Sequence, residues 1–308
     1  MGKIKFILKR LLMLVPVIIC VTFILYVILS AAPGNLARQL LGDDATQEQI
    51  LEKTHEMGLD KPLLVRYGTY MLGVAKLDFG TSWVNGEPVL DKFIYRLPNT
   101  LAISVLAMIF AVAIGVPIGL FCALKQYSIF DYGSSVVAML LFSIPAFWLG
   151  TMCQILFCII LGLLPVSGLD NAAGYVLPTV ILGANTLATM IRMSRSSMLE
   201  VISQDFIRVV KAKGVSDSSI IVKHTLRNSL IPIITQMGIC FAGTIAGAVV
   251  TESIFALQGI GTMLLSAVKS RDVPVVLGTV VFVTLIIGLI NLLVDLICAI
   301  IDPRISLE

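Results

Sequence analysis

The sequence predicts an all-α integral membrane protein with six transmembrane helices, one short cytoplasmic helix, and a small extracytoplasmic segment after the first transmembrane helix. The composition and the arrangement of apolar residues along the chain both predict this class. Hydrophobic residues make up 57% of the 308 residues and charged residues only 13%, whereas soluble domains carry about 25% charge. The mean hydropathy is +0.98. In addition, the apolar residues gather in six long stretches, and a spanning helix needs about 20 such residues.

The six expected spans lie at about 11–31, 100–124, 134–162, 175–193, 231–251 and 275–301. The third and sixth are longer than a straight crossing requires, which predicts tilt, a kink or an interfacial end. Pro145, in "SIPAFW", is the expected kink of the third span, and Pro117 has a similar place in the second.

The distribution of Lys and Arg predicts that both termini are cytoplasmic, because short cytoplasmic flanks carry an excess of basic residues. The N-terminal "MGKIKFILKR" has four basic residues and no acid, and residues 192–230 have seven, whereas 163–174 has none. The first apolar run is about twenty residues long, which favours a retained helix over a cleaved signal peptide.

The expected organisation is an N-terminal transmembrane helix (1–32), an extracytoplasmic segment (33–98), a five-helix core (99–301) that contains the loop 197–230, and a cytoplasmic tail (302–308). In the extracytoplasmic segment, apolar residues at helical spacing predict two short helices outside the membrane. Thr46, followed by Glu48 and Gln49, is the expected cap of the first.

The loop "SQDFIRVVKAKGVSDSSIIVKHTLRNSLIP" is basic in an otherwise apolar chain. Phe206, Val209, Val210 and Lys213 share one helical face, with Ile207 beside them, and Gly214 ends the run as a helix C-cap would. Ser216 is the expected N-cap of a second helix. The pattern leaves two interpretations open, a docking element for a partner protein and an amphipathic segment on anionic headgroups. The candidate site residues in this loop are Asp205, Phe206, Arg208, Val209, Val210, Lys211, Ala212, Lys213, Gly214 and Ser216.

Few polar residues interrupt the spans, and these are the candidates for a transport path. They are Ser143, Asn185, Thr189 and Asp295. Hydrogen bonding between helices is the alternative role. Arg192 and Arg195 are expected to be basic residues at the cytoplasmic end of the fourth span. The Gly115/Gly119 and Gly243/Gly247 pairs would permit close helix contact.

The sequence carries no signature of catalysis. There is no phosphate-binding G-x-x-x-x-G-K-[S/T] motif, so energy for transport would come from another subunit or an ion gradient. His55 and His224 fall on opposite sides of the predicted membrane. The six cysteines lie in apolar runs without metal-ligand spacing, and the net charge of +3 is too small to suggest nucleic acid. We expect no enzyme activity, cofactor or metal in this chain.

Several stretches together resemble the dipeptide, oligopeptide and nickel branch of the ABC importer permeases. "DFIRVVKAKG" and "KHTLRNSLIP" are similar to that branch's form of the cytoplasmic signature loop. The general form of this loop has E-A-A, three further residues and a glycine, and in this chain these positions fall on Arg208, Val209 and Val210, and on Gly214. Arg227 stands where the general pattern has proline, and Gln258 replaces a common proline. Similar stretches follow in order along the chain, namely "FILKRLLMLVPV", "APGN", "GLDKPLLVRYGTYM", "LDFGTSW", "RLPNTL", "TESIFALQGIG", "KSRDVPVV" and "DPRI".

The resemblance implies the transmembrane permease subunit of an ATP-driven type I importer, coupled to its ATPases through residues 203–230. Such a subunit forms half of a path for short peptides, with a second homologous permease, two P-loop ATPases that bind ATP and magnesium, and an extracytoplasmic solute-binding protein. Membrane lipid surrounds it, and its place is the bacterial plasma (inner) membrane. Uptake of nickel or a metal chelate is the alternative within the family. An ion-gradient-driven secondary carrier is the alternative outside it, and would lead us to expect paired intramembrane acids or inverted repeats.

Overall fold

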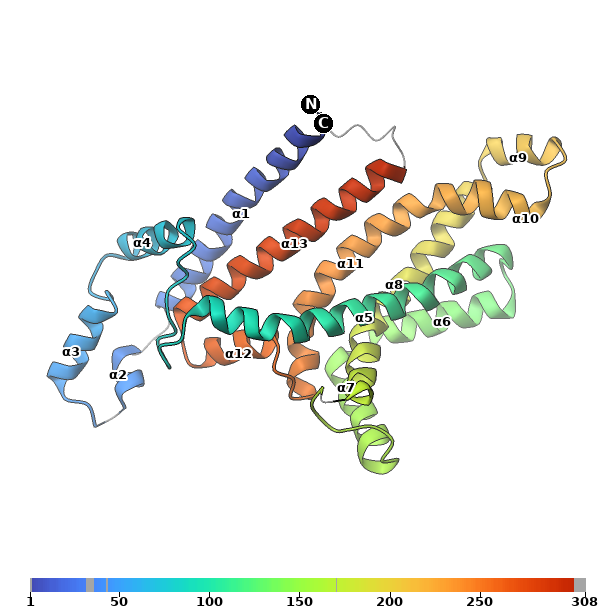
Figure 1. Cartoon of the computed structure of the whole chain (residues 1–308). Coiled ribbons are helices and arrows are strands. Elements are labelled where there is room, and N and C mark those ends of the chain that lie inside the picture. The colour runs from blue at the N-terminus through green and yellow to red at the C-terminus, as the bar shows by residue number, and fades with distance from the viewer. Residues whose placement is uncertain (1, 32–35, 43, 170, 302–308) are drawn as a thin grey trace. The chain divides into compact units, whose positions relative to one another are not determined.

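The computed structural model describes residues 2–31, 36–42, 44–169 and 171–301, and within these ranges the chain is almost entirely helical (Figure 1). The strand-like pairing in the described ranges is a single bridge between Thr81 and Pro88. The chain forms two compact units. One contains Lys3–Pro98 and Thr262–Gly288, and the other contains Asn99–Gly261 and the described residues from Leu289 onward. The motif stretches "APGN" and "DPRI" and the predicted tail lie outside the described residues.

Five helical segments in the described ranges are long and apolar enough to cross a membrane, and a sharply bent pair of helices brings the number to six if the pair is one span. The predicted all-α membrane class is therefore confirmed, with six spans on that count. The five segments are Phe6–Ala31, Val89–Leu124, Ala172–Ile202, Asp217–Ile254 and Val273–Ile301. The corresponding helices are α1 (Gly2–Ala31), α5 (Val89–Leu124), α8 (Val176–Ile202, preceded by the 3-10 turn η2, Ala172–Tyr175), α11 (Arg227–Ile254) and α13 (Val273–Ile301).

The stretch predicted as the third span is broken rather than kinked. Helix α6 (Ile129–Ser143) ends before Pro145, and α7 (Ala146–Gln154), continued by the π-helix η1 (Ile155–Ile160), departs at 98°. Ile144 is extended (φ −76°, ψ 125°), because the ring of a following proline disfavours the helical conformation. Pro117, by contrast, lies inside α5.

In the second unit, α8 packs against α6, α7 and α11. It also crosses α5 closely at two glycines. A Cβ built on Gly119 would lie 2.5 Å from the carbonyl oxygen of Ile191, and one on Gly115 would lie 2.8 Å from Cβ of Met190. The absence of side chains at these positions lets the two helices approach, as their spacing in the sequence permits.

In the first unit, three short helices follow α1 where two were expected. They are α2 (Leu36–Leu41), α3 (Gln47–Glu56) and α4 (Leu63–Ala75). The predicted cap of α3 is confirmed, since Thr46 and Gln49 form a reciprocal capping box. Helix α4 is fastened to α1 by Tyr67, whose hydroxyl donates to the carbonyl of Ile19 at 2.7 Å and lies 3.0 Å from Oγ1 of Thr22. Helix α12 (Ile260–Lys269) precedes α13.

Candidate functional site

The basic loop contains a short helix, α9 (Asp205–Ala212), that lies between α8 and α10 along the chain (Figure 1). Gln204 is its N-cap and Lys213 its C-cap. Gly214 follows with φ +78°, and its N–H donates to the carbonyl of Lys211 at 3.0 Å. This left-handed conformation costs glycine little and other residues more. The predicted helix and glycine turn are therefore present.

The apolar residues of α9 share one side of the helix but differ in how far they are buried. Ile207 is only 7% exposed and Val210 is half-buried, so they hold the helix to the rest of the second unit. Phe206 and Val209, at i and i+3, are 36% and 55% exposed. The single apolar face expected from the sequence is therefore present, and its edge at Phe206 and Val209 is left exposed by the described part of the chain.

The charged residues of the loop pair weakly with one another. Nη1 of Arg208 lies 3.5 Å from Oδ1 of Asp205, and Nζ of Lys211 lies 3.7 Å from Oδ1 of Asp217 across the glycine turn. All four side chains are at least 71% exposed, and exposed pairs of this kind contribute about 0–1 kcal/mol. Ala212 and Lys213 are exposed as well. These charges remain available to a partner or to lipid headgroups.

The expected second helix is not a separate element. Ser216 occupies the N-cap position (φ −61°, ψ 145°), but its side chain makes no capping hydrogen bond. Helix α10 (Asp217–Ser219) runs through the π-helix η3 (Ile220–Leu226) directly into α11, so one helical segment of 38 residues reaches from the glycine turn across the predicted fifth span. Any force on α9 would therefore act on two long helices, α8 and α11.

A cavity of about 300 Å³ lies among α7, α8 and α11. It contains two of the four predicted path residues, Asn185 and Thr189. Its lining residues are all neutral, namely Ala146, Ile181, Leu182, Asn185, Thr186, Thr189, Cys240, Gly243, Thr244, Gly247 and Thr251. A space with hydroxyl and amide groups and no charged wall can hold a polar, uncharged group such as a peptide bond.

The two glycine pairs singled out in the sequence have different surroundings. At Gly115 and Gly119, atoms of α8 occupy the space that a side chain would need. A Cβ on Gly243, by contrast, would meet nothing within 4 Å, and one on Gly247 would meet only Cδ1 of Leu182, at 3.8 Å. The Gly243/Gly247 face of α11 is therefore open in this chain and forms part of the cavity wall.

The other two predicted path residues lie elsewhere. Ser143 is the exposed last residue of α6, and Asp295 is half-buried in α13. Neither lines the cavity.

Arg195 has a role that the basic-flank interpretation did not anticipate. Its guanidinium forms two hydrogen bonds with Asp131 of α6, Nε to Oδ1 at 2.6 Å and Nη2 to Oδ2 at 2.8 Å. Asp131 is 2% exposed. Arg192 lies over the ring of Phe142, 4.7 Å from its centroid. Asp131 lies three residues before the predicted third span and Arg195 two residues after the predicted fourth, so the search for polar residues within spans did not pair them.

Two motif stretches meet at a buried carboxylate in the second unit. Glu252, in "TESIFALQGIG", is fully buried and accepts a hydrogen bond from Oγ1 of Thr100, in "RLPNTL". Thr100 in turn accepts from the backbone N–H of Ile260 at 2.8 Å, and Nδ2 of Asn99 donates to the carbonyl of Gln258 at 2.9 Å. These polar residues therefore join the end of α11, and the loop that follows it, to α5 at Asn99 and Thr100.

A second buried carboxylate joins two further motifs in the first unit. Asp272, in "KSRDVPVV", is 3% exposed. It accepts from Oγ of Ser82 and, at 3.0 Å, from the backbone N–H of Trp83, both in "LDFGTSW". The segment that follows Gly80 is thereby tied to the residue before α13.

Comparison with known proteins gives matches along almost the whole chain. Residues 115–307 match the family model of the binding-protein-dependent transport system inner membrane component, and residues 3–104 match the model of the N-terminal part of such membrane components.

The similar proteins include the dipeptide transport system permease protein DppB of Alkalihalophilus pseudofirmus, 38% identical over 97% of this chain and 98% of the relative. DppB of Escherichia coli is 36% identical over 98% of each chain. A putative peptide transport system permease protein of Brucella suis is 37% identical over 98% of this chain and 99% of the relative.

Among solved structures, a chain of the MetNI methionine ABC transporter in inward-facing conformations superimposes with a TM-score of 0.58. The match covers 69% of this chain and 97% of that chain, at 20% identity. At that identity the likeness concerns the fold.

Proposed function

The chain belongs to the family of inner membrane components of binding-protein-dependent transport systems, and from that membership we propose that it is the permease subunit of an ATP-driven importer of short peptides. The observation that carries the proposal is the geometry of α9. This helix presents exposed apolar residues beside a glycine turn, and it joins two long helices of the predicted membrane domain.

The substrate class follows from the relatives. Those compared above are dipeptide or peptide transport permeases, 36–38% identical to this chain over nearly its full length. The neutral cavity is consistent with peptide bonds, which carry donors and acceptors and no net charge. Its described lining residues include one thiol, that of Cys240, and no imidazole or carboxylate, and this small set of metal ligands favours a peptide over a metal ion as the transported group.

Coupling would proceed through α9. Phe206 and Val209 suit an apolar groove on an ATPase subunit, because burial of two such side chains contributes about 1.5–3 kcal/mol each. The partner would supply the ATP and magnesium chemistry, since this sequence has no phosphate-binding loop. Closure of the two ATPases would then move α9 as a rigid body and, with it, the cytoplasmic ends of α8 and α11.

The translocation path would be shared with a second, homologous permease. The open face at Gly243 and Gly247, together with Asn185 and Thr189, would be this chain's half of that path. The solute-binding protein would deliver peptides on the side of residues 33–98, and both termini would lie in the cytoplasm. Family membership argues against the alternative of a carrier driven by an ion gradient.

The experiment that tests this function uses the complex purified with its partner subunits and reconstituted with ATP. The Phe206→Ala/Val209→Ala variant should lose labelled dipeptide uptake and co-purify with less ATPase, while the chain remains inserted. The matched control, Arg208→Gln/Lys211→Gln, changes the charges of the same helix and should retain the ATPase. If the charge variant alone loses function, α9 acts through anionic partners or lipid, and the apolar docking is wrong.

A further inference from the structure

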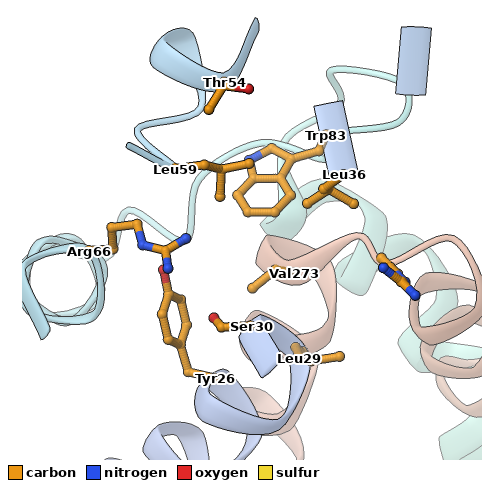
Figure 2. A pocket seen from close by; sticks show the side chains of 10 residues that line it. Tyr26, Leu29, Ser30, Leu36, Thr54, Leu59, Arg66, Trp83 and Val273 are labelled. Carbon is orange, nitrogen blue, oxygen red and sulfur yellow. The ribbon is translucent and has the colours of Figure 1, made fainter. Parts of the chain in front are cut away.

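A second cavity, in the first unit, contains two arginines and has not been given a role. It encloses about 440 Å³. Its lining residues are Tyr26, Leu29, Ser30, Leu36, Thr54, Leu59, Arg66, Trp83, Arg271 and Val273. Figure 2 shows that the side chains of Arg66, Tyr26 and Trp83 point toward one another around Val273. Among the described residues that line it, two are arginines and none is acidic.

Arg66 is placed to receive an anion. Its Nε atom is shielded from solvent and has no hydrogen-bond partner in the part of the chain that the structure describes. The guanidinium carbon lies 5.7 Å from the centroid of the Tyr26 ring, which holds the side chain at the cavity by a cation–π contact. Because the protein covers Nε, an anion in the cavity would be bound by the terminal nitrogens of the guanidinium.

Arg271 contributes the second guanidinium from an unfavourable backbone conformation. Its φ is +53°, a value that glycine adopts freely and that crowds Cβ in other residues. The neighbouring carboxylate of Asp272 is engaged by Ser82 and Trp83. This left-handed conformation ends α12, since the N–H of Asp272 donates to the carbonyl of Ala267 at 2.8 Å, and it leaves the Arg271 side chain at the cavity wall.

We propose that this cavity binds the phosphate of an anionic phospholipid. Arginine forks match phosphate oxygens in two-point hydrogen bonds. Tyr26, Leu29 and Ser30 lie in the last turns of the candidate span Phe6–Ala31, where the hydrocarbon region gives way to headgroups and where Tyr and Trp are enriched. The aliphatic walls suit the glycerol and ester part of a lipid. A recessed, partly apolar space favours a lipid over an acidic side chain of the solute-binding protein.

The test measures phosphatidylglycerol bound to the purified complex by native mass spectrometry. Arg66→Gln/Arg271→Gln should weaken retention by about tenfold or more, since a charge-assisted hydrogen bond contributes enough for such a factor. Arg66→Lys/Arg271→Lys, which keeps the charge and loses the fork, should fall between. Arg96→Gln is the matched control, because Arg96 lines a different cavity that also contains Glu87 and Asp91. The wild type should hold zwitterionic phosphatidylcholine less well.

Three outcomes would overturn the proposal. The first is equal retention of phosphatidylglycerol by the wild type and the Gln variant. The second is full displacement of the lipid by millimolar inorganic phosphate, which would assign the site to free phosphate. The third is loss of the solute-binding protein from a Gln variant that keeps its lipid, which would assign the cavity to receptor docking. The Lys variant and a melting curve for each protein separate these results from misfolding.

Discussion

The guanidinium of Arg195 in α8 donates two parallel hydrogen bonds to the carboxylate of Asp131 in α6, at 2.6 and 2.8 Å. Asp131 also accepts from the backbone N–H of Tyr127 at 3.0 Å, and its own N–H is bound by Ser128 at 3.2 Å. Both carboxylate oxygens are thus satisfied by donors. The pair joins the start of α6 to α8, the helix from which the α9 loop continues.

Removal of one partner of this pair should destabilise the protein strongly. Arg195→Met leaves the buried Asp131 carboxylate without its counter-charge, at a cost of about 3–5 kcal/mol, which corresponds to a fall in melting temperature of roughly 10 °C. The Arg195→Met/Asp131→Leu double variant should recover most of the loss, since an apolar pair needs no counter-charge. Equal melting temperatures for the single variant and the wild type in detergent would show that the pair contributes nothing.

The two glycine pairs should respond differently to a side chain. Gly119→Ala places a methyl group 2.5 Å from the carbonyl oxygen of Ile191, and overpacking of this kind costs about 1–3 kcal/mol. Its thermal stability should therefore fall.

Gly243→Val, by contrast, places its side chain in open space in the cavity wall. Its stability should be unchanged while peptide uptake falls, because the side chain narrows the path. Normal uptake by Gly243→Val in reconstituted vesicles would remove this face from the path, and loss of the second permease on purification would make it a subunit contact instead.

The turn after α9 should tolerate asparagine better than valine. No atom lies within 4 Å of a Cβ built on Gly214, so a substitution acts only through the backbone φ of +78°. Asn enters this region more readily than β-branched residues, for which it costs about 1–2 kcal/mol. Gly214→Val should lose ATP-dependent uptake with normal membrane insertion, and Gly214→Asn should keep most of it. Equal uptake by the two variants would mean that the turn geometry has no part in coupling.

Gly259 should be intolerant of any side chain, because the carboxylate of Glu252 occupies the space. A Cβ there would lie 2.0 Å from Oε1 of Glu252. Gly259→Ala must displace a buried carboxylate that Thr100 holds, and we expect a stability loss of about 1–3 kcal/mol or more. Gly133→Ala is the control, since a Cβ at Gly133 meets nothing within 4 Å. A denaturation curve for Gly259→Ala that overlays the wild type would contradict this packing.

Much of the fold followed from local patterns. Long apolar runs predicted the spans, the Thr46–Gln49 spacing predicted the capping box, and Gly214 predicted the turn after α9, because each of these depends on residues within a few positions of one another. The sharp break at Pro145 was only partly foreseen. Proline marks where a helix is interrupted, but the direction of the next helix, here at 98°, depends on what it packs against.

The sequence by itself therefore determined the membrane class, most of the helices and the position of the loop. The tertiary structure alone decided that Asp131 meets Arg195, that Thr100 meets Glu252, and that Asp272 receives Ser82 and Trp83, since these partners are separated by 64 to 190 residues. It also distinguished Gly115 and Gly119, which let α5 and α8 approach each other, from Gly243 and Gly247, which line a cavity. The physical reason is that burial, ion pairing and helix approach depend on neighbours in space, which a local pattern does not specify.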